Sequence, residues 1–513
     1  MKISYTLSIR RFLSLTIALL HVIFFMRGAQ PESLKDDLFC PGCNVLILDL
    51  SNVRKDHLSV YGYSRDTSPH LKRLAERSFV FTRAYSPADW TLPAATSLLT
   101  SLYPIEHGVV ERIENGGGAL SGEITTLADL MKARGYATLA FTGGFDLHPA
   151  YGVSSRFEVS DHEDQALAGI RSRDQMSLSV GSLRNSIDKM ISWLKANKSK
   201  KFFGYLQSFD AHCPFGKPQI SAEFAKGLKS SLDPNKCYWT AREQKDEGTA
   251  PGLIPVLSTG STPADLLPAA VVSPEDLQYL IALYDGEVKL IDGYIGKLLA
   301  SLEDLGLTQK TIVIVTSGHG DLLGEKGQLM RGGAFQNSQD EVVLNIPLII
   351  YHPKINSSAG RLVRGSLVSL LDIAPTVVRL LGGQIPTQFR GLSLEPLMKS
   401  DTPVHDAVFA SVPHFPVVRG AISRPASIMA TVISGEWKFS RQRKIPREIS
   451  LQAESLDKNF FDEVDGVTTV ERLYNLNSDP LELSDQLQTK KDQADGLREL
   501  LKSHFKSMRS SRE

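Results

Sequence analysis

Residues 44–50, Asn-Val-Leu-Ile-Leu-Asp-Leu, form an almost unbroken apolar run of strand length. Two further runs are similarly apolar and of strand length, residues 311–317 (TIVIVTS) and 346–351 (IPLIIY). Apolar runs that do not alternate with polar residues are typical of strands that are covered on both faces, as in a parallel sheet. We therefore expect a parallel sheet with helices above and below it.

Helical patterns lie between the strand-like runs. They cover residues 68–78, 123–135, 182–197 and 274–306, and strand-like segments at 137–142 and 202–208 follow two of them. The last pattern begins with Ser273 and Pro274, an N-cap followed by proline, and it ends at Gly306. Strand and helix alternating over most of the chain predict an α/β fold, a doubly wound, mostly parallel sheet flanked by helices.

The pattern of apolar and polar residues changes from about Phe409 onward. Short alternating segments at 427–433 and 436–440 are joined by polar loops, and a helical pattern covers 491–505. We predict a sheet domain over residues 41–400, followed by a smaller C-terminal antiparallel subdomain with a terminal helix over 401–513.

The N-terminus has the pattern of a targeting segment. The basic residues Lys2, Arg10 and Arg11 precede an apolar stretch at 12–26, which is shorter than the roughly 20 residues that span a bilayer. We predict a signal peptide over residues 1–29 and a secreted or periplasmic protein. An uncleaved membrane anchor stays open, because Arg27 lies where a small residue normally precedes the cleavage site.

Export makes the four cysteines candidates for disulfides. Cys40 and Cys43 form a C-x-x-C motif that precedes a strand, whereas redox motifs usually follow one, so we expect a structural pair. A bridge between Cys213 and Cys237 would close a loop of moderate length and contribute about 3 kcal/mol.

Composition limits the class of partner. The chain has 513 residues, of which 42% are hydrophobic and 22% charged, and 57 basic residues balance 57 acidic ones. Such a chain can bury a large core, but it has no global positive field for a polyanion. We therefore predict no nucleic-acid partner, and a membrane contact only if the N-terminal segment stays uncleaved.

Several short motifs, taken in order, resemble the sulfatase family within the alkaline-phosphatase superfamily. They are Asp56-His57 with 61–63 (YGY), 67–69 (TSP), 98–104 (LLTSLYP), 210–214 (DAHCP), 284–288 (YDGEV), 316–320 (TSGHG) and 368–376 (VSLLDIAPT). The likeness covers roughly residues 44–396 and resumes at 435–438 and 473–480. It implies a sulfatase-like fold and the cleavage of sulfate or phosphate monoesters.

The resemblance also implies a particular site. Cleavage of such an ester needs a nucleophile, a divalent cation and groups that bind the other oxygens. In sulfatases a hard cation such as Ca²⁺ is held by two acids after the first strand and by a D-[NH]-G turn. The nucleophile is a Cys or Ser in a C/S-x-P-x-R motif, and it is oxidised to formylglycine.

This sequence departs from that pattern at most of its positions. Ser51 and Asn52 stand where the two acids belong, and Gly318 replaces the acid of the D-[NH]-G turn. The nucleophile motif reads TLPAA at 91–95, so Ala95 replaces its arginine and no formylglycine precursor is present. A family histidine after the turn is replaced by Lys326.

The residues that remain define the candidate site. By the resemblance, Thr91 is the candidate nucleophile, and His107, His212 and Arg331 are candidates to surround an anion. The candidate metal ligands are Asp49 and His319, with Asp321 and Glu325 as further carboxylates nearby. Two plainer interpretations stay open: Thr91 caps the helix that follows it, and Asp49 pairs with a neighbouring side chain.

Two classes of function follow from this reading. The favoured one is a pseudoenzyme, a non-catalytic binder on a sulfatase scaffold that recognises a small anionic ester, an anionic glycan or a protein. It would bind Ca²⁺ or Mg²⁺ weakly, because three expected carboxylates are missing. The alternative is an active hydrolase or transferase of sulfate or phosphate monoesters that uses Thr91 and a rebuilt metal site.

Overall fold

The computed structural model describes residues 38–111, 113, 117–143, 146–162, 183–213, 215, 223–234, 238–240, 254–258, 270–329, 338–355, 361–363, 365–414, 427–444, 460–461 and 467–510. By its contacts the chain divides into two units, residues 1–37 and Leu38–Glu513. The predicted signal peptide lies outside the described residues. None of the described helices has the length and apolarity to cross a bilayer.

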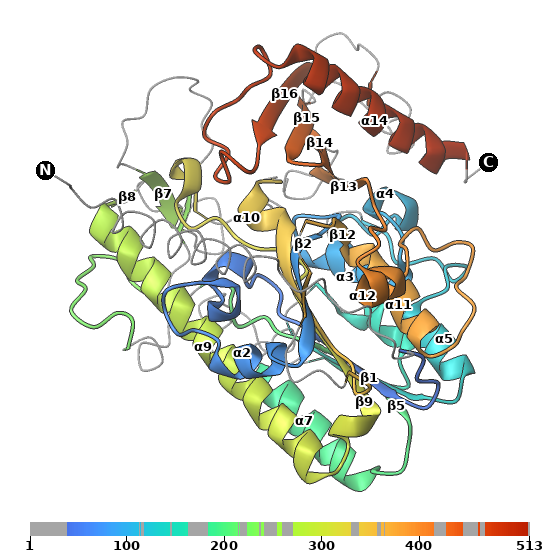
Figure 1. The fold of residues 1–513 in the computed structure, drawn as a ribbon. Coiled ribbons are helices and arrows are strands. Elements are labelled where there is room, and N and C mark those ends of the chain that lie inside the picture. The colour runs from blue at the N-terminus through green and yellow to red at the C-terminus, as the bar shows by residue number, and fades with distance from the viewer. Residues whose placement is uncertain are drawn as a thin grey trace, which may run out of the picture. The chain divides into compact units, whose positions relative to one another are not determined.

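A nine-stranded sheet forms the centre of the second unit (Figure 1). Its strands in spatial order are β11 (Arg361–Val363), β2 (Ser78–Tyr85), β10 (Asn345–Tyr351), β9 (Thr311–Thr316), β1 (Asn44–Asp49), β5 (Phe202–Gln207), β3 (Ala137–Thr142) and β4 (Val159–His162), and β12 (Val368–Ser369) also pairs with β2. Every residue of β1 is buried, and β1 pairs in parallel with β5 and β9. The predicted mostly parallel sheet is confirmed.

The strand β10 is the exception to the parallel arrangement. It runs antiparallel to both of its neighbours, β2 and β9. Its residues from Ile346 to Tyr351 are buried like those of β1. The apolar run predicted a covered strand correctly, but burial on both faces does not depend on the direction of a strand.

Helices cover both faces of the sheet (Figure 1). One group consists of α2 (Pro69–Ala75), α7 (Leu183–Ala196) and α9 (Pro274–Asp304), and the other of α3 (Thr91–Thr100), α5 (Leu127–Ala133), α11 (Ile373–Leu380) and α12 (Glu395–Ser400). The helix α9 begins where the sequence predicts, since the Ser273 hydroxyl accepts a hydrogen bond from the Asp276 N–H. At Gly296, α9 packs so closely on α2 that a Cβ would lie 2.2 Å from Nδ1 of His70.

Shorter elements connect these layers. They are the helices α4 (Pro104–His107) and α10 (Glu341–Leu344), and the single-turn helices η1 (Lys55–His57), η2 (Ser59–Tyr61), η4 (Pro149–Tyr151), η5 (Ser154–Arg156), η8 (Thr308–Lys310), η9 (Glu325–Gly327) and η10 (Leu370–Asp372). A separate three-stranded antiparallel sheet contains β6 (Tyr238–Thr240), β7 (Ile254–Ser258) and β8 (Ala270–Val272).

The C-terminal part forms the predicted small antiparallel sheet. Its four strands are β13 (Ala407–His414), β14 (Ser427–Ser434), β15 (Trp437–Lys444) and β16 (Thr468–Asn475). The helix α14 (Lys491–Ser510) covers this sheet, and its Leu497, Leu501 and Phe505 share an apolar core with Phe439 and Leu473. The exact boundary between the two predicted domains stays a prediction.

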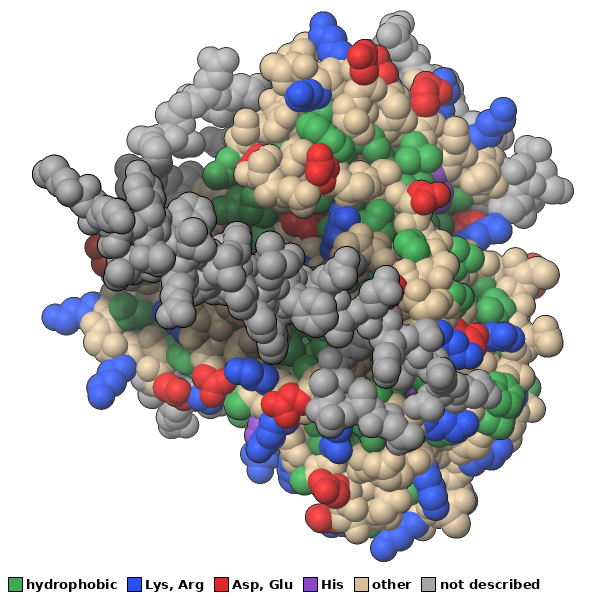
Figure 2. Space-filling model, viewed as in Figure 1, with side chains coloured by type: hydrophobic (Ala, Val, Ile, Leu, Met, Phe, Trp, Pro, Cys, Tyr) green, Lys and Arg blue, Asp and Glu red, His purple; other side chains and the backbone are tan. Residues whose placement is uncertain are grey.

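Charges of both signs are interspersed over the described part of the surface in Figure 2. No large region of one sign dominates the described atoms of this face. The pattern agrees with the formal net charge of zero.

Two of the cysteines close a short loop ahead of β1. Cys40 and Cys43 form a disulfide, as the structural interpretation of the C-x-x-C motif expects. Cys213 is also disulfide-bonded, and its predicted partner, Cys237, lies outside the described residues.

We expect peptide mapping of the natively secreted protein without reduction to find Cys40 joined to Cys43 and Cys213 joined to Cys237. Cysteines of exported proteins are oxidised to disulfides, and no cytosolic function of these thiols is evident in this chain. Free thiols at Cys213 and Cys237 in secreted protein would contradict both the bridge and the predicted export.

Candidate functional site

The candidate site lies where the central strands end. Asp49 of β1 is in register with Thr316 of β9, so the loops that follow both strands start side by side. The N-terminus of α3, with Thr91, reaches the same place, because Thr91 contacts His319 in the loop after β9. Ligand sites of open α/β sheets characteristically lie at the carboxyl ends of their strands.

Asp49 is fully buried and its carboxylate is held by hydrogen-bond donors. The Tyr205 hydroxyl donates to Oδ2 (2.7 Å), and the Gly318 N–H (3.0 Å) and the Ser51 hydroxyl (3.4 Å) donate to Oδ1. Burial raises the pKa of Asp49 to about 6, although these hydrogen bonds oppose the shift. The structure thus pairs this carboxyl with protein donors from β5 and from the loop after β9.

The two residues after Leu50 point to different partners. Gln207 donates its side-chain N–H to the Ser51 hydroxyl (3.0 Å). Asn52 has a left-handed backbone (φ 74°), and its Nδ2 donates to Oδ2 of Asp321 (2.9 Å) and to the carbonyl of Ala211 (2.7 Å). The buried Oδ1 of Asn52 has no hydrogen-bond partner among the described residues.

The turn after β9 brings Thr91 and His319 together. Oγ1 of Thr91 lies 3.1 Å from Nε2 of His319, and Nδ1 of His319 lies 2.9 Å from the carbonyl oxygen of Gly320. Thr91 is 2% exposed and His319 is fully buried. Of the predicted site residues, this pair has the most direct contact.

His212 is the next predicted residue that the structure places at this site. Its ring stacks on Phe209 at 3.8 Å between centroids and meets His319 edge to face at 5.8 Å. His212 is half-buried, whereas His319 is not exposed at all. His212 therefore lies on the more accessible side of the pair.

His107, which is predicted to help surround an anion, is buried and hydrogen-bonded within the fold. Its Nε2 contacts the Ser97 hydroxyl (3.1 Å) and its Nδ1 accepts from the Val109 N–H (3.1 Å). Burial lowers the pKa of His107 to about 3, so the ring is neutral at physiological pH. His107 links α3 to the loop after α4, and its neutral ring carries no positive charge.

Two basic residues follow the turn, Lys326, which replaces a family histidine, and Arg331, which is predicted to help surround an anion. Lys326 lies in an ion cluster, where its Nζ is 2.5 Å from Asp340 and 3.7 Å from Glu482. Its charge is therefore paired with two carboxylates. Glu482 also pairs with the buried Lys438 of β15 (2.7 Å), which ties the C-terminal sheet to this loop. Arg331 lies outside the described residues.

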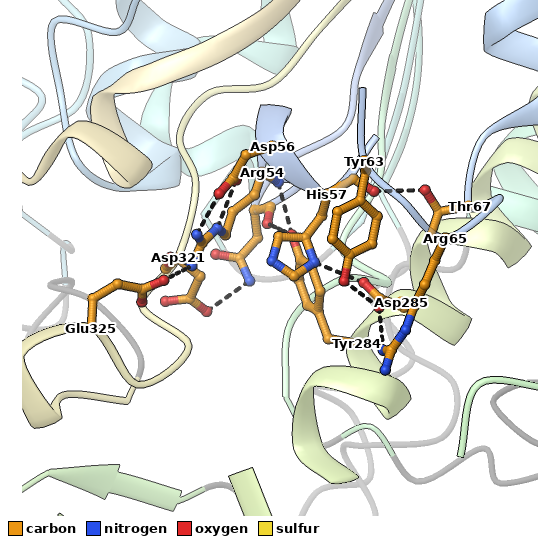
Figure 3. A network of polar contacts seen from close by, with 11 residues as sticks. Arg54, Asp56, His57, Tyr63, Arg65, Thr67, Tyr284, Asp285, Asp321 and Glu325 are labelled. Atoms are coloured by element: carbon orange, nitrogen blue, oxygen red, sulfur yellow. Dashed lines mark hydrogen bonds and ion pairs between the residues drawn. The ribbon is translucent and has the colours of Figure 1, made fainter. Parts of the chain in front are cut away.

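Sequence reasoning missed a polar network beside the site, which Figure 3 shows. The buried guanidinium of Arg54 donates to Asp56 (2.7 Å), to Glu325 (2.6 Å) and to the carbonyl of Asp321 (3.2 Å). The two acids therefore neutralise Arg54, and Glu325 is engaged with this cation. The sequence shows Arg54 two residues before Asp56, but it does not show the second acid that binds Arg54, Glu325, which lies 271 residues away.

The second half of this network is centred on Asp285 of α9. This buried carboxylate accepts from Nδ1 of His57 (2.7 Å), the Tyr63 hydroxyl (2.8 Å) and the Arg65 guanidinium (2.6 Å). Its neighbour Tyr284 donates to the carbonyl of Asn52 (2.8 Å) and accepts from the Arg54 N–H (2.8 Å). The network fixes the loop after β1 against α9.

The residues at the family's metal position do not fit a hard divalent cation. Ca²⁺ takes six to eight oxygen ligands, several of them carboxylates. The contacts of Ser51, Asn52 and Gly318 include two carboxylates: Asp49, which accepts from Tyr205 and Gly318, and Asp321, which accepts from Asn52. The unpartnered Oδ1 of Asn52 adds a single neutral oxygen. Among the described residues, no group of three or more His, Cys, Asp or Glu side chains is placed to hold a metal.

Comparisons with known proteins relate this chain to sulfatases. The sulfatase family model matches residues 44–383. Arylsulfatase K of Rattus norvegicus is 27% identical over 391 residues, which cover 72% of this chain and 65% of the rat protein. The match therefore spans less than two thirds of that relative's length.

Solved structures share the fold. A phosphonate monoester hydrolase of Agrobacterium radiobacter superimposes with a TM-score of 0.63 at 21% identity, covering 91% of this chain and 96% of the hydrolase. A protein solved in complex with its substrate D-glucosamine-2-N,6-O-disulfate gives a TM-score of 0.63 at 18% identity, covering 91% of this chain and 98% of that protein.

Proposed function

The chain belongs to the sulfatase family, and we propose that it is an exported member that binds anionic sulfate esters or sulfated glycans with weak or absent hydrolysis. The cation-dependent half of the family's site has become a hydrogen-bonded core. The half that contacts the anion is kept in part.

The observation that carries the proposal is the state of Asp49. Its two oxygens accept from Tyr205, Gly318 and Ser51, so protein donors occupy the positions at which a cation would bind these oxygens. Ser51 and Gly318 leave no second carboxylate beside it. A dication placed there would lose its hydration without gaining the negative ligands that offset this loss.

The anion-binding side of the proposal rests on α3 and two histidines. Pro93 has no N–H, and the Ala94 N–H donates to Trp90 within the helix (3.2 Å), so the N–H groups of Thr91 and Leu92 form the positive end of α3. His212 and His319 lie beside that end. A sulfate group is the kind of anion that such a helix terminus binds.

A sulfated amino sugar is the most direct probe, because a protein of the same fold was solved with D-glucosamine-2-N,6-O-disulfate as its substrate. The full chain is titrated with this sugar by calorimetry, once in EDTA and once in Ca²⁺, and turnover of 4-nitrophenyl sulfate is measured in the same buffers. We expect binding in both buffers and little turnover. Rapid turnover that requires Ca²⁺ would refute the proposal, and the absence of binding would refute its anion-binding part.

Metal content gives an independent test. We expect the purified full chain to hold far less than one Ca²⁺ or Mg²⁺ per molecule by mass spectrometry, and no aldehyde on the tryptic peptide that contains Thr91. Stoichiometric metal that resists dialysis would contradict the proposal.

Restoring the acids should restore the cation. We expect the Ser51→Asp, Gly318→Asp double variant to gain thermal stability when Ca²⁺ is added, by about 2–3 kcal/mol once free Ca²⁺ reaches 100 times Kd, while the unchanged protein shows no such gain. Gly318 does not have a left-handed backbone, and a Cβ there would lie 3.8 Å from Oδ1 of Asp49 and 3.3 Å from the Ala94 Cβ. Thermal unfolding in EDTA and in Ca²⁺ measures the difference, and a Ser51→Asn, Gly318→Asn variant controls for added bulk without charge.

A further inference from the structure

We infer that Thr91 and His319 form a metal-independent nucleophile and base pair, able to attack the central atom of a phosphate or sulfate ester. The inference deepens the proposed function and rests on it for the place where a substrate binds. It concerns a reaction of the chain's own side chains, with no cation involved.

Two hydroxyl groups of α3 each contact a histidine at a similar distance. Thr91 lies 3.1 Å from Nε2 of His319, and Ser97 lies 3.1 Å from Nε2 of His107. By distance alone, the two hydroxyl and imidazole pairs are equivalent. The two pairs differ in the hydrogen-bond partner of the other ring nitrogen, Nδ1.

The partner of Nδ1 decides which nitrogen of His319 carries the proton. The carbonyl oxygen of Gly320 can only accept, so Nδ1 of His319 donates to it (2.9 Å). In the neutral ring Nε2 is then the acceptor, and the Thr91 hydroxyl donates to it. This is the orientation in which an imidazole withdraws a proton from a nucleophilic hydroxyl.

The ring of His107 has the opposite arrangement. Its Nδ1 accepts from the backbone N–H of Val109 (3.1 Å), so the proton of the neutral ring is on Nε2. Nε2 is therefore a donor, and it faces the Ser97 hydroxyl and the Pro93 carbonyl, which also hydrogen-bonds this ring. His107 therefore cannot withdraw a proton from Ser97, and the hydrogen-bond partners select Thr91 as the activated hydroxyl.

The position of Thr91 in α3 supports the same role. Thr91 is the first residue of the helix, and its cap, Trp90, makes no side-chain hydrogen bond to the first turn. The N–H groups of Thr91 and Leu92 can face the oxygens of a tetrahedral group that approaches the Thr91 hydroxyl. They are the oxyanion donors that remain where Ala95 replaces the arginine.

The chemical step is balanced without a further reactant except water. The Oγ1 of Thr91 forms a bond to phosphorus or sulfur as the bond to the leaving alcohol oxygen breaks. The proton of Thr91 passes to Nε2 of His319 and then to the departing alkoxide. Water hydrolyses the threonine ester, and His319 accepts the proton of that water and returns it to Thr91.

The test uses diisopropyl fluorophosphate on the EDTA-dialysed full chain. This neutral probe requires no anion site, and its P–F bond breaks as the threonine Oγ–P bond forms. We expect one adduct by intact mass, located at Thr91 by peptide sequencing and retained at position 91 in Thr91→Ser. The adduct should be absent in Thr91→Val and form about 100-fold more slowly in His319→Ala, while Ser97→Ala reacts as the unchanged chain does.

The outcomes separate this inference from the proposed function. An adduct at Ser97, equal labelling with and without His319, or no adduct in chain shown to be folded by circular dichroism would overturn the inference, even if the sulfated sugar binds. Labelling at Thr91 without sugar binding would sustain the inference and refute the anion-binding proposal. Residual turnover of 4-nitrophenyl phosphate or 4-nitrophenyl sulfate should persist in EDTA and disappear in Thr91→Val.

Discussion

Replacing Asp285 by alanine is expected to lower the free energy of unfolding by about 3–5 kcal/mol, the range found when one partner of a buried ion pair is removed. Asp285 is fully buried and accepts from His57, Tyr63 and Arg65. The alanine variant leaves three donors without their common acceptor, in a place where water cannot fully replace it. Chemical denaturation of both proteins at neutral pH measures the loss.

A matched control comes from an exposed ion pair on the same helix. Lys297 of α9 pairs with Asp188 of α7, and both side chains are about half exposed. The Lys297→Ala change should cost 1 kcal/mol or less. An equal loss in the two variants would mean that the Asp285 network adds nothing beyond a surface contact.

The network around Asp285 also shows what a single sequence can and cannot reveal. The helix α9 was predictable from its periodicity, its Ser273 cap and its end near Gly306, and the structure has it at Pro274–Asp304. Its inward-facing Asp285 was visible only as part of a family motif. Its three partners lie 220 to 228 residues away, and no local pattern encodes such a contact.

The sheet was predictable for a different reason. Continuous apolar runs report burial on two faces, and the runs at β1, β9 and β10 all became buried strands. Their order and direction depend on the pairing of distant segments, so the antiparallel β10 was not foreseen. The same limit applied to the C-terminal sheet, where alternation indicated strands but not their order.

The candidate site was likewise predictable only in part. Motif matching brought Thr91 and His319 into one hypothesis, and they lie 3.1 Å apart. It also grouped His107 with them, although His107 bonds to Ser97 and Val109. A motif fixes the residue type and its place along the chain, while the tautomer and the charge of a ring depend on neighbours that only the folded chain supplies.

The stability of the protein is expected to fall by about 3 kcal/mol as the pH rises from about 3 to well above 6, through Asp49 alone. Burial raises the pKa of Asp49 from 3.8 to about 6, and one pKa unit corresponds to 1.36 kcal/mol. Below pH 3.8 the carboxyl is protonated in both states. Between the two pKa values the carboxyl is deprotonated in the unfolded chain but still protonated in the folded one, so the free energy of unfolding falls as the pH rises. Above pH 6 the carboxyl is deprotonated in both states, and the free energy of unfolding falls no further through this group.

The Asp49→Asn variant isolates this effect. Its side chain has nearly the same shape and no charge, so the stability of Asp49→Asn relative to the unchanged protein should rise by about 3 kcal/mol between about pH 3 and pH 7.5. In Tyr205→Phe, which loses the 2.7 Å hydrogen bond to Asp49, the pKa of Asp49 should rise further and the pH window should widen. Denaturation curves of the three proteins at several pH values in EDTA provide the measurement.

The sign of that pH dependence distinguishes a hydrogen-bonded core from a metal site. A bound cation favours the charged carboxylate, lowers its pKa in the folded chain and makes the protein more stable as the pH rises. Asp49→Asn would then be less stable than the unchanged protein at pH 7.5 in Ca²⁺, and EDTA would abolish the difference. The donors around Asp49 instead predict that the stability of Asp49→Asn relative to the unchanged protein rises with pH and does not depend on Ca²⁺, because Tyr205 and Gly318 already occupy the oxygens that a cation would need.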